Sequence, residues 1–179
     1  MTDRILFPLN YGSGIADHIT QSYTRMKHSI FEPGVKQGLF ERVDLLQTDT
    51  KGKWGKLNVA QMLRHLAEAN RMAFADIPMP DRSTLLTRTL IKWMFLRNIK
   101  PPGREKGNIK TFPEVDIVQQ GIAVQDLESE KERYKASIER LMAAPQLHHS
   151  HTAFGKMSRE DWGLLAYAHA DYHLTQFGV

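Results

Sequence analysis

The sequence contains no cysteine and no apolar run long enough to cross a membrane. Without cysteine there is no disulfide, thiolate ligand or cysteine nucleophile, so any metal must be bound by imidazole, carboxylate or water. A membrane-spanning helix needs about 20 apolar residues, and the first residues lack the long apolar core of an export signal. We therefore expect a soluble, cytoplasmic protein without a membrane partner.

An excess of one charge is also lacking. The 24 lysines and arginines outnumber the 20 acidic residues by only four, and both signs are scattered along the chain. No basic stripe with interleaved aromatic residues and no nucleic-acid-binding module is visible, so we expect no nucleic-acid partner. At 179 residues and 41% apolar composition, the chain fits one core. We expect one domain over residues 26–179, after an N-terminal extension at residues 1–25.

Apolar residues that recur every three or four positions predict an all-α fold, a mostly helical bundle. The four expected helices are Pro33 to Gln47, Asn58 to Asp76, Asp126 to Ala143 and Ser158 to Phe177. An extra helix at Thr84 to Ile99 and a turn-rich crossover ending at Pro113 separate the second helix from the third.

Local signals refine these helices. Asn58 is a suitable N-cap for the second helix, and Ser158 with Asp161 forms an approximate capping box at the start of the fourth. In the second helix, Met62, Leu66, Ala69 and Ala73 form one apolar stripe. In the third helix, we expect Tyr134, Ile138 and Leu141 to face inward and Glu128, Lys131, Glu132 and Lys135 to form a charged outer face.

Two histidines in the fourth helix indicate metal chemistry. His169 and His173, in the segment HADYH, are four residues apart, so their imidazoles leave the helix on the same side. His65 lies between apolar residues in the middle of the second helix, where an unpaired polar ring would be costly to bury. We expect these three imidazoles to bind one divalent ion, zinc, nickel or iron, with coordination positions left open for water or a substrate.

A general base is harder to assign. HADYH lacks the glutamate that follows the first histidine in the HExxH pattern of metalloproteases. Glu68, one turn after His65, is the only candidate for a catalytic base, and a solvated or ion-paired helix carboxylate is the alternative interpretation.

Two other clusters are open to interpretation. We interpret His148, His149 and His151 as exposed loop residues, with contact between His151 and the edge of the site as the alternative. Residues 84–100 combine basic and apolar side chains, as a helix at a membrane surface does. We favour packing of this segment against the bundle or against a second subunit in a homodimer.

Two segments resemble a known family. WGKLNVAQMLRH at residues 54–65 and FGKMSREDWGLLAYAHADYHLTQFG at residues 154–178 resemble the two ends of a domain-of-unknown-function branch of the DinB-like superfamily. The resemblance covers about residues 26–179, and the second segment is the more specific. It departs from the usual pattern at Thr152, where proline is common, and at Met157, which replaces a common leucine.

The resemblance implies a four-helix bundle with a long connection between the second and third helices. It also implies a divalent metal on one histidine of the second helix and two of the last, which correspond to His65, His169 and His173. Other members of the superfamily include thiol-dependent transferases, isomerases and metal-dependent hydrolases. We therefore expect a metal-dependent transferase or hydrolase that activates a low-molecular-weight thiol or water against a small-molecule substrate. A non-catalytic metal- or ligand-binding bundle is the competing hypothesis.

Overall fold

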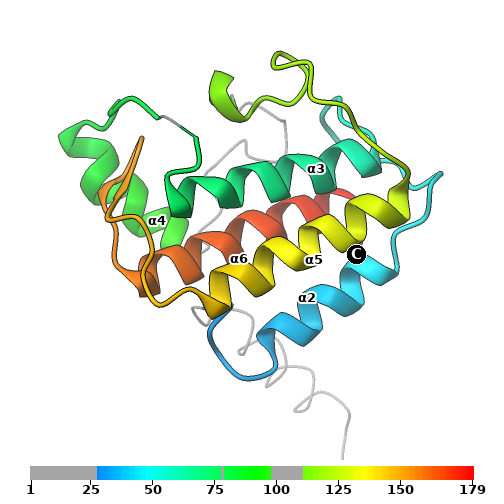
Figure 1. Ribbon diagram of the computed structural model, residues 1–179, viewed down its shortest axis with the longest axis horizontal. Coiled ribbons are helices and arrows are strands. Elements are labelled where there is room, and N and C mark those ends of the chain that lie inside the picture. Colours follow the sequence, from blue (N-terminus) through cyan, green and yellow to red (C-terminus); the bar gives the residue numbers. More distant parts are fainter. Residues whose placement is uncertain (1–27, 78, 98–110) are drawn as a thin grey trace, which may run out of the picture.

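A computed structural model describes residues 28–77, 79–97 and 111–179, and this part of the chain is mostly helical (Figure 1). The expected extension at residues 1–25 lies outside the described residues, as do residues 98–110 of the crossover. The elements are α2 (Val35–Asp44), α3 (Val59–Asn70), η1 (Arg71–Phe74), η2 (Thr87–Ile91), α4 (Lys92–Leu96), η4 (Pro113–Val115), α5 (Leu127–Ala143), β1 (Ser150–His151), β2 (Gly155–Lys156) and α6 (Arg159–Gln176).

The helices α2, α3, α5 and α6 surround a common core. In Figure 1 these helices run side by side, and α3 and α2 each contact both α5 and α6. The expected inward-facing residues of α5 are buried, as is the apolar stripe of α3. Other large residues of this core are Ile30, Leu39, Val43, Leu46, Leu63, Trp162 and Leu174. No described helix is both long enough and apolar enough to span a membrane.

The predicted N-terminal caps of two helices are confirmed. The side chain of Asn58 accepts a hydrogen bond from the backbone N–H of Gln61, and the side chain of Gln61 accepts one from the backbone N–H of Asn58. Ser158 and Asp161 form the same reciprocal box at α6. These boxes fix where α3 and α6 begin, because each satisfies two backbone N–H groups that have no partner within the helix.

Three predicted helix ends are wrong, one of them being the end of the first helix, which lies at Asp44 and not at Gln47. The first helix was expected from Pro33 but begins at Val35, because Gly34 takes a left-handed φ of 81° that no helix accommodates. The second was expected to remain regular to Asp76. Its α-helical part ends at Asn70 and continues as the 3-10 helix η1 to Phe74, where Ala75 takes the left-handed conformation and turns the chain.

The predicted extra helix is present over residues 85–96, although it starts with a regular turn and a π-helical stretch, η2, before α4. Its predicted end at Ile99 lies outside the described residues. The segment packs beside the start of α6 and the short β1–β2 hairpin (Figure 1). Thr87, Ile91 and Phe95 are spaced by four and line the main cavity, whereas Leu85 and Trp93 are exposed.

The charged outer face predicted for α5 is wrong at Lys131, which is buried. Its ammonium donates to the backbone carbonyl of Asp44 at the end of α2 and to Glu128. A cation at this position satisfies a carbonyl that the end of α2 leaves without a helical partner.

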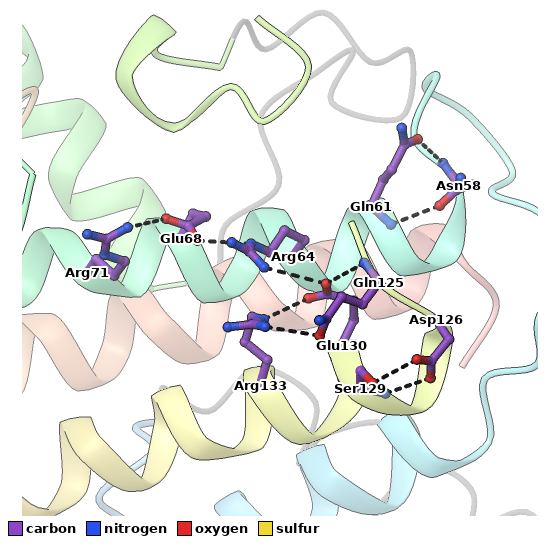
Figure 2. A network of polar contacts seen from close by, with 10 residues as sticks. All are labelled: Asn58, Gln61, Arg64, Glu68, Arg71, Gln125, Asp126, Ser129, Glu130 and Arg133. Atoms are coloured by element: carbon purple, nitrogen blue, oxygen red, sulfur yellow. Dashed lines mark hydrogen bonds and ion pairs between the residues drawn. The ribbon is translucent and has the colours of Figure 1, made fainter. Parts of the chain in front are cut away.

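A buried carboxylate joins α3 to α5, which the sequence patterns did not indicate. Glu130 is fully buried between Arg64 of α3 and Arg133 of α5 and accepts the backbone N–H of Gln125 (Figure 2). Opposite charges and a backbone donor together offset the desolvation of this carboxylate. These ion pairs therefore hold α3 against α5 at the end of α3 that lies away from η1.

Candidate metal centre and its cavity

The structure brings His65, His169 and His173 together, as the sequence predicted. One ring nitrogen of each lies within 4.8 Å of those of the other two, and the three ring centroids are 4.9 to 5.1 Å apart. His65 comes from α3, and the other two come from successive turns of α6. The group could therefore hold a metal ion between two helices that the chain connects only through a long excursion.

His65 is oriented by the backbone of η4. Its Nδ1 lies 3.3 Å from the carbonyl oxygen of Val115, so Nδ1 carries the proton and Nε2 keeps its lone pair. The ring is buried, and this burial lowers the pKa of His65 below its ordinary value although the Val115 carbonyl and nearby Asp116 oppose the shift. Burial thus favours the neutral imidazole, which is the form that binds metals.

His173 is oriented by Gln176, one turn further along α6. Its Nδ1 lies 2.8 Å from Gln176 Oε1, while Gln176 Nε2 donates to the backbone carbonyl of Trp54 at 2.5 Å. The donation to a carbonyl fixes which end of the amide faces the imidazole, since only its oxygen can accept from Nδ1–H. Nε2 of His173 is then the nitrogen that keeps its lone pair.

One of the distances between ring nitrogens is compatible with a shared cation as well as with a hydrogen bond. Nε2 of His65 and Nε2 of His169 are 3.2 Å apart, and two nitrogens at about 2.05 Å from a tetrahedral zinc lie about 3.3 Å apart. A proton on His169 could bridge that one pair. One cation shared by the three imidazoles is the alternative to that single hydrogen bond. Hydrogen bonds from the distal ring nitrogens to a carbonyl and an amide are the usual support of metal-ligating histidines.

A large cavity lies against the cluster. It has a volume of about 680 Å³, and all three histidines line it. Its walls are mainly apolar, with small side chains of α3, η1 and α6 (Ala69, Ala73 and Ala166) beside larger ones of η2 and α4. This volume is within the range of small-molecule sites. Positions of an ion not occupied by imidazole would open towards this space.

Glu68 lies apart from the cavity. Its buried carboxylate accepts from Arg64 at 2.9 Å and from Arg71 at 2.7 Å, and Glu68 is not among the residues that line the cavity. Figure 2 shows this carboxylate as one member of a chain of ion pairs along α3. Its role as a catalytic base stays a prediction, and the observed contacts are those of a structural ion pair.

The three loop histidines have different environments. His148 and His149 lie against each other outside the main cavity. His151, by contrast, is buried and lines the cavity, so the predicted exposure is wrong for this residue, and its contact with the edge of the metal site stays a prediction. The reason is the β1–β2 hairpin, which folds the loop back under α4.

Sequence patterns missed Gln176, Val115 and Tyr172. Tyr172 lines the cavity, and its hydroxyl accepts from Nε1 of Trp54 at 3.0 Å. The spacing of Gln176, three residues after His173 on the same helix, is a signal that could have identified it. Val115 acts through its backbone carbonyl, which leaves no residue-type signal.

Comparison with known proteins gives a family and no named relative. No curated protein and no solved structure matches this chain. The model of one family, described as a protein of unknown function (DUF1569), matches residues 36–178, a range that contains all three cluster histidines, Gln176 and His151. The chain therefore belongs to the DUF1569 family.

Proposed function

We propose that this protein is a metal-dependent enzyme for a small, largely apolar substrate, with one divalent ion on His65, His169 and His173. The observation that carries the proposal is the convergence of three imidazoles, two of them with fixed tautomers, at the wall of a cavity of about 680 Å³. Three protein ligands with an open position are typical of catalytic rather than structural zinc sites.

The proposed reaction is transfer or hydrolysis, with a low-molecular-weight thiol or water as the nucleophile. A bound ion would lower the pKa of that nucleophile and polarise the electrophile. The protein would hold the ion through the three neutral imidazoles, keep their orientation through Val115 and Gln176, and exclude bulk water with its apolar walls. Zinc, nickel and iron all suit such ligands.

We further propose a DinB-like four-helix bundle and a cytoplasmic location. The packing of α2, α3, α5 and α6 around one core and the position of η2 and α4 between α3 and α5 in the chain support the former. The lack of cysteine, which suits a reducing compartment, supports the latter.

Metal content tests the site. We expect mass spectrometry to find about one ion per chain in the wild type after reconstitution with zinc or nickel, and none in His65→Ala or in the double variant His169→Ala, His173→Ala. His149→Ala is the matched control, because it removes an imidazole outside the cluster and should keep the ion. The proposed site would be contradicted if the control lost metal equally or if the cluster variants retained it.

Cobalt substitution tests for an open position. In the cobalt-loaded protein we expect added 2-mercaptoethanol to change the visible spectrum through a new thiolate-to-cobalt band, and azide to shift it. An unchanged spectrum with both probes would favour the non-catalytic alternative, in which the ion mainly ties α3 to α6. A thiol-sensitive spectrum justifies assays of glutathione transfer to chlorodinitrobenzene and of p-nitrophenyl acetate hydrolysis.

A further inference from the structure

His151 is held in one tautomer at the wall of the cavity. Its Nδ1 accepts two backbone hydrogen bonds, from the N–H of Ala153 at 3.1 Å and of Phe154 at 3.3 Å. A nitrogen that accepts N–H donors presents its lone pair, so the single proton of the neutral ring is on Nε2. The hairpin turn itself therefore makes His151 a hydrogen-bond donor.

The ring of His151 belongs to the main cavity. It stacks on Phe154 with centroids 4.7 Å apart and meets the edges of Trp162 at 5.6 Å and Phe112 at 6.2 Å. All three of these rings line the same cavity as the metal cluster, whereas His151 itself lines both this cavity and a smaller one of about 260 Å³. We place its donor at the main cavity because its ring contacts are with these three aromatic residues. Trp162 is fixed in turn, because its Nε1 donates to the His148 carbonyl at 2.6 Å.

The donor lacks an acceptor among the described residues. His151 is only 5% exposed, yet no described group accepts a hydrogen bond from its Nε2–H. Among the described residues, the side-chain atoms sealed from solvent without a hydrogen-bond partner are Glu130 Oε2 and the Tyr134 hydroxyl and do not include Nε2 of His151. This donor therefore borders a cavity and is open to an acceptor on a ligand. Burial lowers the pKa of His151 to about 4, with a further contribution from Lys92, so the ring is neutral at physiological pH.

The donor and the metal cluster contact the cavity about two turns of α6 apart. His151 packs on Trp162, at the start of α6, whereas His169 lies seven residues further along, about 10 Å at 1.5 Å per residue. Between them, α6 and α3 contribute Leu165, Ala166 and Ala69 to the wall. A ligand that reaches both therefore has an apolar middle.

We infer that Nε2–H of His151 binds an uncharged acceptor, a carbonyl or ether oxygen, on the substrate end remote from the metal cluster. This inference deepens the proposed function and rests on it for the position of the reacting end. An uncharged acceptor is favoured because Lys92, the cation whose charge acts on the His151 ring, is already paired with Asp161 at 2.8 Å. A carboxylate there would be buried with only a neutral donor. The substrate class is thus an elongated apolar molecule with a ketone, ester, amide or ether function.

Two variants separate the donor from the turn. In His151→Asn, the side-chain oxygen can still accept from the backbone N–H groups two and three residues on, as in an Asx-turn, but the amide does not reach the position of Nε2. In His151→Gln, the longer amide can reach the cavity as a donor, while the turn loses its acceptor.

The experiment measures binding of three small probes by NMR in the metal-free protein, where the metal site cannot contribute. Acetophenone carries the uncharged acceptor, ethylbenzene is its hydrocarbon counterpart and benzoate is the charged counterpart. We expect wild type to bind acetophenone best, and His151→Asn to lose roughly three- to tenfold for acetophenone alone, the size of one net hydrogen bond. His151→Gln should recover part of this loss. Long-range proton–nitrogen spectra of histidine-labelled protein should show the proton of His151 on Nε2, and its resonance should shift with acetophenone.

Several outcomes would overturn the inference. These are equal losses for acetophenone and ethylbenzene, a preference for benzoate, a proton on Nδ1, or no binding of any probe by the wild type. None of these outcomes bears on metal uptake, which is measured separately on the same variants after reconstitution. Conversely, a protein that binds acetophenone through His151 but takes up no metal would contradict the proposed function and keep the acceptor subsite.

Discussion

Replacing Gln176 by methionine should weaken metal binding although Gln176 is not a ligand. Its Oε1 accepts from His173 Nδ1 at 2.8 Å, and its Nε2 is held by the Trp54 carbonyl at 2.5 Å. Methionine has a similar volume and flexibility but offers neither strong bond. The substitution therefore removes the orientation of His173 and leaves the packing of this buried side chain largely in place.

The expected size follows from the role of such partners. Loss of a hydrogen bond that orients a metal-ligating histidine typically lowers metal affinity 10- to 100-fold, which is about 1.4 to 2.7 kcal/mol of binding free energy. His173 is one of three ligands, and the Val115 carbonyl still orients His65. We therefore expect weaker binding with unchanged stoichiometry.

Competition titration of zinc against a chromophoric chelator measures this change. Gln176→Glu is the matched control, because a carboxylate accepts from Nδ1–H at least as well as an amide although it cannot donate to Trp54; it should restore most of the affinity. Gly55→Ala is a second variant that should displace the Gln176 amide. Gly55 has a φ of 85°, and an added Cβ would overlap Gln176 Nε2. Zinc affinity of a folded Gln176→Met protein within twofold of wild type would refute the reasoning.

Three further results are expected. In metal-free protein, the pKa of His151 is about 4 when folded and 6.5 when unfolded, so the unfolded chain binds more protons between these values. The free energy of unfolding should then fall as pH drops from 6.5 towards 4, by about 3 kcal/mol at most, and denaturant titrations should show a smaller fall in His151→Asn. Gly163→Ala should destabilise the fold by about 1 to 3 kcal/mol by overpacking Ser29 and Phe31, with full metal content; unchanged stability would contradict this close contact. Glu130→Ala should lower the free energy of unfolding by about 1 to 3 kcal/mol, since the Gln125 N–H loses its acceptor and Arg64 keeps only Glu68 as a carboxylate partner, and a thermal midpoint equal to that of wild type would count against it.

The metal cluster could be predicted because its signals are local. His169 and His173 share a helix face by spacing alone, and His65 stands out as a polar residue inside an apolar stretch. Helix starts at Asn58 and Ser158 were predictable for the same reason, since a capping box lies within four residues. What spacing could not supply is the approach of α3 to α6 that brings the three rings together.

The features that were missed depend on contacts between distant segments. Lys131 occupies a surface position in the periodicity of α5, and only the end of α2 above it makes that position buried. Glu130 is a charged residue whose burial depends on Arg64 of another helix. His151 stands in a polar, histidine-rich loop, and its burial results from the hairpin and from α4. Residue type alone predicts solvent exposure for all three.

The cavity has a sequence signal of its own, although periodicity conceals it. Ala69 and Ala73 occupy the same apolar stripe as Met62 and Leu66, and a pattern of apolar and polar positions treats all four alike. The larger pair fills the core, whereas the alanines follow His65 by one and two turns and line open space. Ala166, one turn before His169, repeats the arrangement on α6. Small residues beside candidate ligands on both helices thus leave room next to the metal cluster, and larger side chains at these three positions would close the space that the proposed substrate occupies.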